Sequence, residues 1–246
     1  MRTDHAPVAY PASRTVHAVG HRGDPYLVRE NTLASLRSAV ARGADAVEVD
    51  VRLTSDGVPV LLHDESFRRL WRDARPVVSL TAAEVRELSD GGVPTLREAL
   101  EATGPARVMI DLPGAMAGTV REVVGLVREC GARDRVYYCA GATTMLAVRA
   151  ADPGAEIAMT WTSVCPPSRS LVEAVAPRWL NYRFGVLSRE LVEALHADGF
   201  LVSAWTADTK RTMRRLIAMG VDSVTTNRVA ALVGVRAAAG AVGLPR

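Results

Sequence analysis

Lysine is almost absent from this chain of 246 residues, because Lys210 is the only one and the remaining basic residues are arginines. The arginines are spread along the chain among Asp and Glu, so the net charge of +3 does not come from a basic block. Chains that bind nucleic acid usually gather basic residues in one run or on one face. The distribution therefore favours solvated helix faces over a nucleic-acid surface.

Cysteine is also scarce, and Cys130, Cys139 and Cys165 show no C-x-x-C spacing. This excludes a cysteine-based zinc cluster and a disulfide framework, and it is typical of a reducing compartment. No stretch reaches the roughly 18 uncharged apolar residues that a spanning helix needs, and residues 1–14 lack the apolar core of a secretory signal. We expect a soluble, cytoplasmic protein with a flexible N-terminal arm at residues 1–14, and the sequence indicates no oligomeric state.

Aromatic residues make up only 5% of the chain although 48% is hydrophobic, so aliphatic side chains have to build the core. Apolar runs with β-branched residues alternate with helical patterns, which is typical of an α/β fold with a parallel sheet. Strands are expected at 15–21, 46–53, 58–64, 107–112, 135–140, 156–161, 179–183, 200–206 and 222–226. Helices are expected at 31–43, 143–151, 168–175, 188–199 and 209–220.

The second and third expected strands are separated only by residues 54–57, TSDG. A parallel pair needs a crossover of about a dozen residues, so this pair should be an antiparallel hairpin. With its turn at Ser55 and Asp56, the hairpin would place His63 beside Glu48. The other eight strands predict a TIM (β/α)8 barrel with one extra antiparallel strand, in a single domain over residues 15–246.

Residues 65–94 are too long for an ordinary βα loop and should form a small insertion over the barrel mouth. Thr81 and Glu84 have the spacing of a capping box, which predicts one helix there. Phe67, Leu70 and Trp71 could give the mouth an apolar rim.

Two acidic residues, Glu48 and Asp50, alternate with valines on a predicted barrel strand. The period of a strand puts both carboxylates on one side, facing the barrel interior, and the valines on the other, facing the helices. Two ionised carboxylates on one dry wall repel each other, so either one is protonated or a cation lies between them. A solvated strand edge is the alternative interpretation, which the flanking valines make less favourable.

His21 and Arg22 end the first predicted strand, where barrel strands deliver catalytic groups, and His63 nears the end of the hairpin. Imidazoles exchange protons near neutral pH, and a guanidinium matches phosphate oxygens. Together with a cation held by carboxylates, these groups are what phosphoryl chemistry needs. His17 lies deeper on the same strand as His21 and is interpreted as a core residue.

Six segments of the chain carry recognisable motifs: HRG (21–23), ENT (30–32), GADAVEVDVRLTSDGVPVLLHD (43–64), PTLREAL (94–100), AWTADT (204–209) and GVDSVTTN (220–227). Together they resemble the glycerophosphodiester phosphodiesterase family. They occur in the family's order and span nearly the whole chain, and the block at 43–64 is the most specific.

The resemblance implies a divalent ion, Mg²⁺ or Ca²⁺, that polarises the phosphodiester while one histidine deprotonates the nucleophile and the other protonates the departing alcohol. By analogy, His21 is the base and His63 the acid. In a glycerol diester, the neighbouring 2-hydroxyl can be the first nucleophile, giving a cyclic phosphate that water opens to glycerol 3-phosphate. The implied metal ligands are Glu48, Asp50 and Asp111, with Arg22 on the phosphate and Trp205 lining the substrate cleft.

The chain departs from the family pattern at three positions of the expected site. Asp111 stands where a glutamate is usual in the family. The related sphingomyelinases D also have an aspartate at this position. Pro113 replaces a lysine that contacts phosphate, and Asn227 replaces the aspartate of a T-D pair. Arg183, near the end of the LNYRF strand, is our candidate for the missing cationic contact.

Three functions are therefore open at this stage. The first is metal-dependent hydrolysis of glycerophosphodiesters to glycerol 3-phosphate and an alcohol. The second is a lysophospholipase D or sphingomyelinase D-like phosphodiesterase, suggested by Asp111 and by the apolar insertion. The third is a non-catalytic phosphate-binding barrel, suggested by Pro113 and Asn227. The sequence does not identify the alcohol or the ion.

Overall fold

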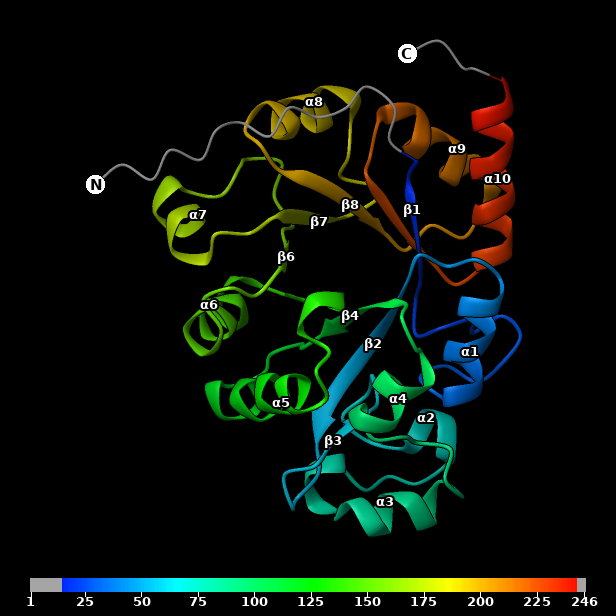
Figure 1. The fold of residues 1–246 in the computed structure, drawn as a ribbon, viewed down its shortest axis with the longest axis vertical. Coiled ribbons are helices and arrows are strands. Elements are labelled where there is room, and N and C mark those ends of the chain that lie inside the picture. The colour runs from blue at the N-terminus through cyan, green and yellow to red at the C-terminus, as the bar shows by residue number, and fades with distance from the viewer. Residues whose placement is uncertain (1–14, 243–246) are drawn as a thin grey trace.

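Nine strands form one sheet in the computed structural model, which describes residues 15–242 (Figure 1). Eight of them are parallel and close into a barrel, because β1 pairs with both β2 and β9. The predicted (β/α)8 barrel with an extra strand is therefore confirmed, whereas the expected arm at residues 1–14 lies outside the described residues. The barrel strands are β1 (His17–Gly20), β2 (Ala46–Leu53), β4 (Arg107–Asp111), β5 (Val136–Ala140), β6 (Ile157–Thr160), β7 (Trp179–Arg183), β8 (Leu201–Trp205) and β9 (Ser223–Thr226).

Helices surround the barrel and cover its outer face (Figure 1). Their order follows the strands, so each crossover returns the chain to the same end of the barrel. No helix within residues 15–242 is long and apolar enough to cross a membrane. The helices are α1 (Leu33–Ala41), α2 (Arg68–Trp71), α3 (Ala82–Leu88), α4 (Leu96–Ala102), α5 (Ala117–Glu129), α6 (Ala142–Ala151), α7 (Arg169–Val175), α8 (Arg189–Ala197), α9 (Lys210–Met219) and α10 (Val229–Val242), with short 3-10 turns η1 (Val77–Ser79) and η2 (Arg133–Arg135).

The extra strand β3 (Pro59–Leu61) pairs antiparallel with the end of β2, beyond the part of β2 that pairs with β4. The predicted register is wrong by one residue. Val51 pairs with Leu61, so Asp50 lies opposite Leu62 and His63 does not lie opposite Glu48.

The cause of the different register is the length of the hairpin loop. The Thr54 N–H donates to the Val58 carbonyl, which leaves three residues in the loop instead of two, and Gly57 takes a φ of 78°. Three-residue hairpin loops commonly end on a glycine in this left-handed conformation, which shifts the pairing by one position.

Strand β2 shows how the alternation divides the two faces of the barrel wall. Val47, Val49 and Val51 are buried in the core between the barrel and the helices. Ala46, Glu48 and Asp50 alternate with them, and Ala46 belongs to the small cluster that fills the barrel interior. The prediction that the valines face the helices and the carboxylates the interior is confirmed. The interpretation of His17 as a core residue is wrong, because His17 is exposed at the start of β1.

The insertion at 65–94 folds around its own small core at the β3 end of β2 (Figure 1). The predicted capping box forms, since Thr81 and Glu84 cap α3 reciprocally. The idea that Phe67, Leu70 and Trp71 form an exposed apolar rim is wrong. Phe67 is fully buried, Leu70 is half-buried, and Trp71 packs against the same core under the guanidinium of Arg29. The insertion reaches the carboxyl end of the barrel through Arg69 of α2 instead.

Candidate active site

Three carboxylates converge at the carboxyl end of the barrel. Asp50 of β2 and Asp111 of β4 are strand partners in register, and Glu48 lies two residues before Asp50 on the same side of β2. Ligand atoms from all three side chains lie within 4.8 Å of one another. The structure therefore brings together the three acidic residues that the sequence and the resemblance suggested.

Burial makes the negative charge of this cluster costly. The pKa of Glu48 is raised well above its usual range, first by burial and then by the nearby charges of Asp50 and Asp111. Burial, followed by the charge of Asp50, also raises the pKa of Asp111 to about 7. Protons or a cation have to neutralise part of this wall near neutral pH.

The turn after β1 supplies the first positive charge. Arg22 takes a left-handed φ of 55°, so its backbone N–H donates to Glu48 Oε2 at 2.8 Å while its Nε lies 3.0 Å from Asp50 Oδ2. Gly23 follows with a φ of 89°, and a Cβ there would lie 2.5 Å from the backbone carbon of Ser35. The glycine of the HRG motif is therefore required both for its conformation and for the close approach of α1.

The ENT motif orients the same groups from the N-terminal side of α1. Asn31, with a φ of 54°, donates from Nδ2 to Asp50 Oδ2 at 2.8 Å. Thr32 caps α1 by accepting the N–H of Ser35. Glu30 accepts from Arg22 at 2.8 Å and from Arg69 at 2.6 Å, and these contacts lower the pKa of Glu30 although burial alone would raise it. Our sequence reasoning gave these three residues no role.

His21 lies beside the carboxylates and is largely buried. Its Nε2 is 4.0 Å from Glu48 Oε2, and its Nδ1 lies 2.7 Å from Oδ1 of Asn227 after β9. Burial, followed by the charge of Arg22, lowers the pKa of His21. The imidazole is thus fixed through one nitrogen and keeps the other on the carboxylate side.

His63 follows Leu62, the residue that pairs with Asp50, and its ring is about half exposed. Its Nδ1 lies 2.7 Å from Asp64 Oδ1, and Arg69 bridges Asp64 to Glu30. The Arg69 hydrogen bond, with a smaller contribution from His63, lowers the pKa of Asp64. A continuous chain of charged groups therefore joins the ring of His63 to Arg22 and the carboxylates.

The wall of the barrel on the β7 and β8 side carries the other predicted residues. Arg183 and Trp205 are strand partners at the carboxyl ends of β7 and β8. Nε1 of Trp205 is buried and has no hydrogen-bond acceptor among the described residues. Arg183 is exposed and makes no ion pair within residues 15–242. Both remain available to contact a substrate.

The donor set of the acidic cluster fits a hard divalent cation. One oxygen of Asp50 accepts from Asn31 and one of Glu48 accepts from Arg22, while the other oxygen of each has no donor among the residues that the structure describes. Carboxylate oxygens are the ligands that Mg²⁺ and Ca²⁺ prefer. The cluster is a possible metal site on these grounds.

Comparisons with known proteins identify the family of this chain. The model of the glycerophosphoryl diester phosphodiesterase family matches residues 21–231. The chain belongs to this family. The match confirms the expectation of an enzyme of the glycerophosphoryl diester phosphodiesterase family, and it includes the HRG motif and the turn after β9.

Individual family relatives cover most of the chain. The chain is 28% identical over 226 residues to the glycerophosphodiester phosphodiesterase of Caldanaerobacter subterraneus, covering 85% of this chain and 93% of that one. It is 31% identical to the probable glycerophosphodiester phosphodiesterase 2 of Mycobacterium tuberculosis, and the match covers 86% of this chain and 87% of that one. An Oleispira antarctica phosphodiesterase, solved in complex with the product sn-glycerol-3-phosphate, has the same fold, with a TM-score of 0.82 at 22% identity over 89% of this chain and 96% of that one.

Sequence reasoning missed several residues that hold the site of this family member together. Asp64 and Glu30 orient His63 and Arg22, and Asp208 binds Asn227. The sequence signals were present, since Asp64 directly follows His63 and Glu30 opens the ENT motif. The link from Asp208 to His21 runs through Asn227, which the sequence analysis noted only as a departure from the family.

Proposed function

We propose that this protein hydrolyses glycerophosphodiesters to glycerol 3-phosphate and an alcohol with a divalent ion, Mg²⁺ or Ca²⁺. The convergence of Glu48, Asp50 and Asp111 within 4.8 Å, beside His21 and Arg22, carries the proposal. The product complex of the Oleispira antarctica relative supports the same reaction class.

The three carboxylates would hold the ion through their free oxygens. A divalent ion bound there supplies positive charge that neutralises phosphate oxygens and polarises the phosphorus atom. Arg22 adds a second positive charge on the same side, although its Nη1 and Nε already contact Glu30 and Asp50. We assign Arg22 to phosphate binding. Arg183, on the opposite side of the barrel, is assigned to the phosphate contact that Pro113 cannot make. Trp205 is assigned to the lining of the substrate cleft.

The surroundings of the two imidazoles support the assignment of His21 as the base and His63 as the acid. His21 is buried and has a neutral amide partner, so its neutral form can accept the proton of the attacking hydroxyl at Nε2. The carboxylate of Asp64 holds the ring of His63 through Nδ1, so that its Nε2 can donate a proton to the departing alcohol oxygen. Each histidine uses Nδ1 for its partner and keeps Nε2 for the reaction.

A panel of phosphodiesters tests this function. Glycerophosphocholine and glycerophosphoethanolamine are incubated with Mg²⁺, with Ca²⁺ or with EDTA, and release of glycerol 3-phosphate is scored. We expect turnover that EDTA abolishes and that is lost in His21→Ala and His63→Ala. No turnover with either ion would contradict the proposal and support the alternative of a non-catalytic phosphate-binding barrel.

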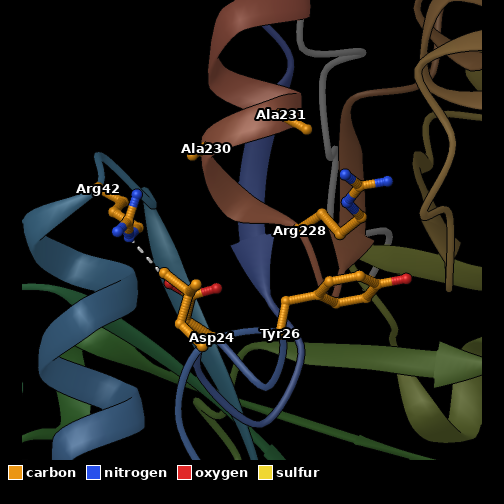
Figure 2. A pocket seen from close by; sticks show the side chains of 7 residues that line it. Asp24, Tyr26, Arg42, Arg228, Ala230 and Ala231 are labelled. Carbon is orange, nitrogen blue, oxygen red and sulfur yellow. Dashed lines mark ion pairs between the residues drawn. The ribbon is translucent and has the colours of Figure 1, made fainter.

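A lysophospholipid is the second candidate substrate. Tyr26 and Leu27, in the loop after β1, are each 60% exposed and line a cavity of about 210 Å³ between α1 and α10, where the ring of Tyr26 lies under Arg228 (Figure 2). Met116 after β4 and Val164 after β6 are also exposed at this end of the barrel. Such apolar side chains can contact an acyl chain. Faster turnover of a lysophosphatidylcholine than of glycerophosphocholine would favour this candidate.

We propose a reducing, cytoplasmic location from the chemistry of the cysteines. Cys130, Cys139 and Cys165 are all free thiols, and Cys165 is exposed. An exposed unpaired thiol is prone to oxidation outside the cytosol. Fractionation of cells that express the tagged protein tests this location.

A further inference from the structure

Asp208, after β8, and Asn227, after β9, form a hydrogen-bonded chain that ends on His21. Asn227 Nδ2 donates to Asp208 Oδ2 at 2.7 Å, and Asn227 Oδ1 lies 2.7 Å from Nδ1 of His21. The other oxygen of Asp208 accepts the backbone N–H of Asn227 at 2.8 Å and the hydroxyl of Thr226 at 3.1 Å. The carboxylate is therefore held in place through both of its oxygens.

The donors and acceptors along this chain determine which nitrogen of the His21 ring carries the hydrogen. The Asp208 carboxylate can only accept, so the NH₂ group of Asn227 has to face Asp208 and its carbonyl oxygen has to face His21. That oxygen is also only an acceptor, so the contact with Nδ1 is a hydrogen bond only if Nδ1 carries the hydrogen. In a neutral ring, Nε2 is then left with the lone pair, on the side of Glu48.

We propose that Asp208 and Asn227 are positioning residues that hold His21 in its Nδ1–H tautomer and so leave Nε2 free to accept a proton. The inference rests on the proposed role of His21 as the base, because a ring with hydrogen on Nε2 has no lone pair there. Asp208 sets the direction of the amide, and the amide sets the tautomer. Neither residue touches the substrate in this account.

Single and paired substitutions at positions 208 and 227 should have opposite effects on the tautomer of His21. In Asp208→Asn, a new NH₂ group would face the NH₂ group of Asn227. A flip of the Asn227 amide relieves this clash but turns its NH₂ group toward Nδ1 of His21. Nδ1 then has to accept a hydrogen bond, so the hydrogen of the neutral ring has to lie on Nε2. In Asn227→Asp, two carboxylates would face each other at hydrogen-bond distance and repel. In the exchange variant with both changes, the amide at 208 donates to the carboxylate at 227, which accepts from Nδ1 as the wild-type amide does.

The test compares the three variants with the wild-type enzyme, using kcat and KM for glycerophosphocholine and the ¹⁵N NMR signals of the imidazoles. We expect each single variant to lose about 10- to 100-fold in kcat with little change in KM. We expect the exchange variant to recover to within about threefold of wild type. The His21 ring, assigned by its loss in His21→Gln, should be the Nδ1–H tautomer in the wild type and the exchange variant and the Nε2–H tautomer in Asp208→Asn.

Asp222→Asn is the matched control, since Asp222 also lies 2.8 Å from an imidazole, that of His196, but at the opposite end of β9. We expect it to leave the kcat of the folded enzyme unchanged. An exchange variant as impaired as the single variants, or a His21 ring that stays Nδ1–H in Asp208→Asn, would overturn the proposal. If the wild type shows no turnover, the proposed function fails, but the NMR comparison still decides whether Asp208 sets the tautomer.

Discussion

The two imidazoles of this site differ in almost every aspect of their surroundings. His21 is largely buried, with 20% of its side chain exposed, and its partner is a neutral amide 206 residues away in sequence. His63 is 43% exposed, and its partner is the carboxylate of the next residue. The first ring is placed by the closure of the barrel, and the second by a hairpin and a charged network at its rim.

This contrast supports the proposal that the two side chains perform opposite proton transfers. Burial lowers the pKa of His21, whose partner is a neutral amide, and this favours an uncharged ring that can accept a proton. The more exposed ring of His63 is held through Nδ1 by a carboxylate. The acidic wall of Glu48, Asp50 and Asp111 is common to both. Substitutions that affect the wall should therefore impair both halves of the reaction, and substitutions around one ring should affect only that ring.

The largest effect is expected from Asp111→Asn, which weakens the shared wall. Loss of one carboxylate ligand should reduce kcat/KM by about a thousandfold and lower the affinity for Mg²⁺, because the ion supplies several kcal/mol of transition-state stabilisation. Steady-state kinetics and metal titration by calorimetry measure both. Asp152→Asn is the control, since Asp152 binds Arg133 at the end of α6 and not the site. Unchanged activity and metal affinity in Asp111→Asn would contradict the assignment.

Gly23→Ala should distort the turn that positions His21 and should also lower the stability of the fold. An added Cβ would lie 2.5 Å from the backbone of Ser35 at a φ of 89°, so we expect unfolding to become easier by about 3 to 5 kcal/mol. Gly57→Ala is the matched control, because Gly57 has a similar φ but open space around it. It should cost only about 1 to 2 kcal/mol. Equal losses in urea unfolding would show that the contact with α1 is unimportant.

Asp64→Asn should affect only the His63 side. An amide at position 64 no longer offers Nδ1 of His63 a charged hydrogen-bond partner, so the ring is held less firmly and kcat for glycerophosphocholine should fall about tenfold. A substrate with a 4-nitrophenolate leaving group needs little acid assistance, so its turnover should change by less than about threefold. Asp73→Asn, which breaks an ion pair with Arg75 in the neighbouring insertion, should change neither. Equal losses on both substrates would argue against an acid role for His63.

The smallest effect concerns the pH dependence of stability without metal. Asp111 has a folded pKa of about 7, above the roughly 3.9 of an unfolded aspartate. The unfolded chain therefore binds fewer protons than the folded chain between these values, so stability should fall as pH rises from about 4 to about 7. Mg²⁺ should raise Tm by several degrees more at pH 8 than at pH 5. A larger rise at pH 5, measured by differential scanning fluorimetry, would contradict this.

Much of the fold could be predicted from local patterns in the sequence. The alternation of strands and helices predicted the barrel, and the short TSDG segment predicted the hairpin strand. Its register could not be derived, because the three-residue loop depends on how Thr54 and Val58 pair and on the φ of Gly57. The burial of Phe67 was missed for a related reason, since it depends on how the insertion folds on itself.

The part of the candidate site that depends only on strand geometry could be predicted from the sequence. The period of a strand placed Glu48 and Asp50 on one side, whereas Asp111 was found only through the family resemblance. The contacts of Glu30 with Arg69 and of Asn227 with His21 join residues 39 and 206 positions apart. No local pattern encodes such pairs, because the first forms only when the insertion packs beside the loop after β1 and the second only when the barrel closes.

The central claim, that His21 accepts a proton and His63 donates one, is tested most directly by comparing His21→Gln and His63→Gln on two glycerol 3-phosphodiesters. One carries choline and the other 4-nitrophenol as the leaving alcohol. We predict that His63→Gln loses at least about 100-fold in kcat/KM on the choline ester but less than about fivefold on the nitrophenyl ester, whereas His21→Gln loses at least about 100-fold on both. Equal losses of His63→Gln on both esters, or the reverse pattern between the two histidines, would contradict the account.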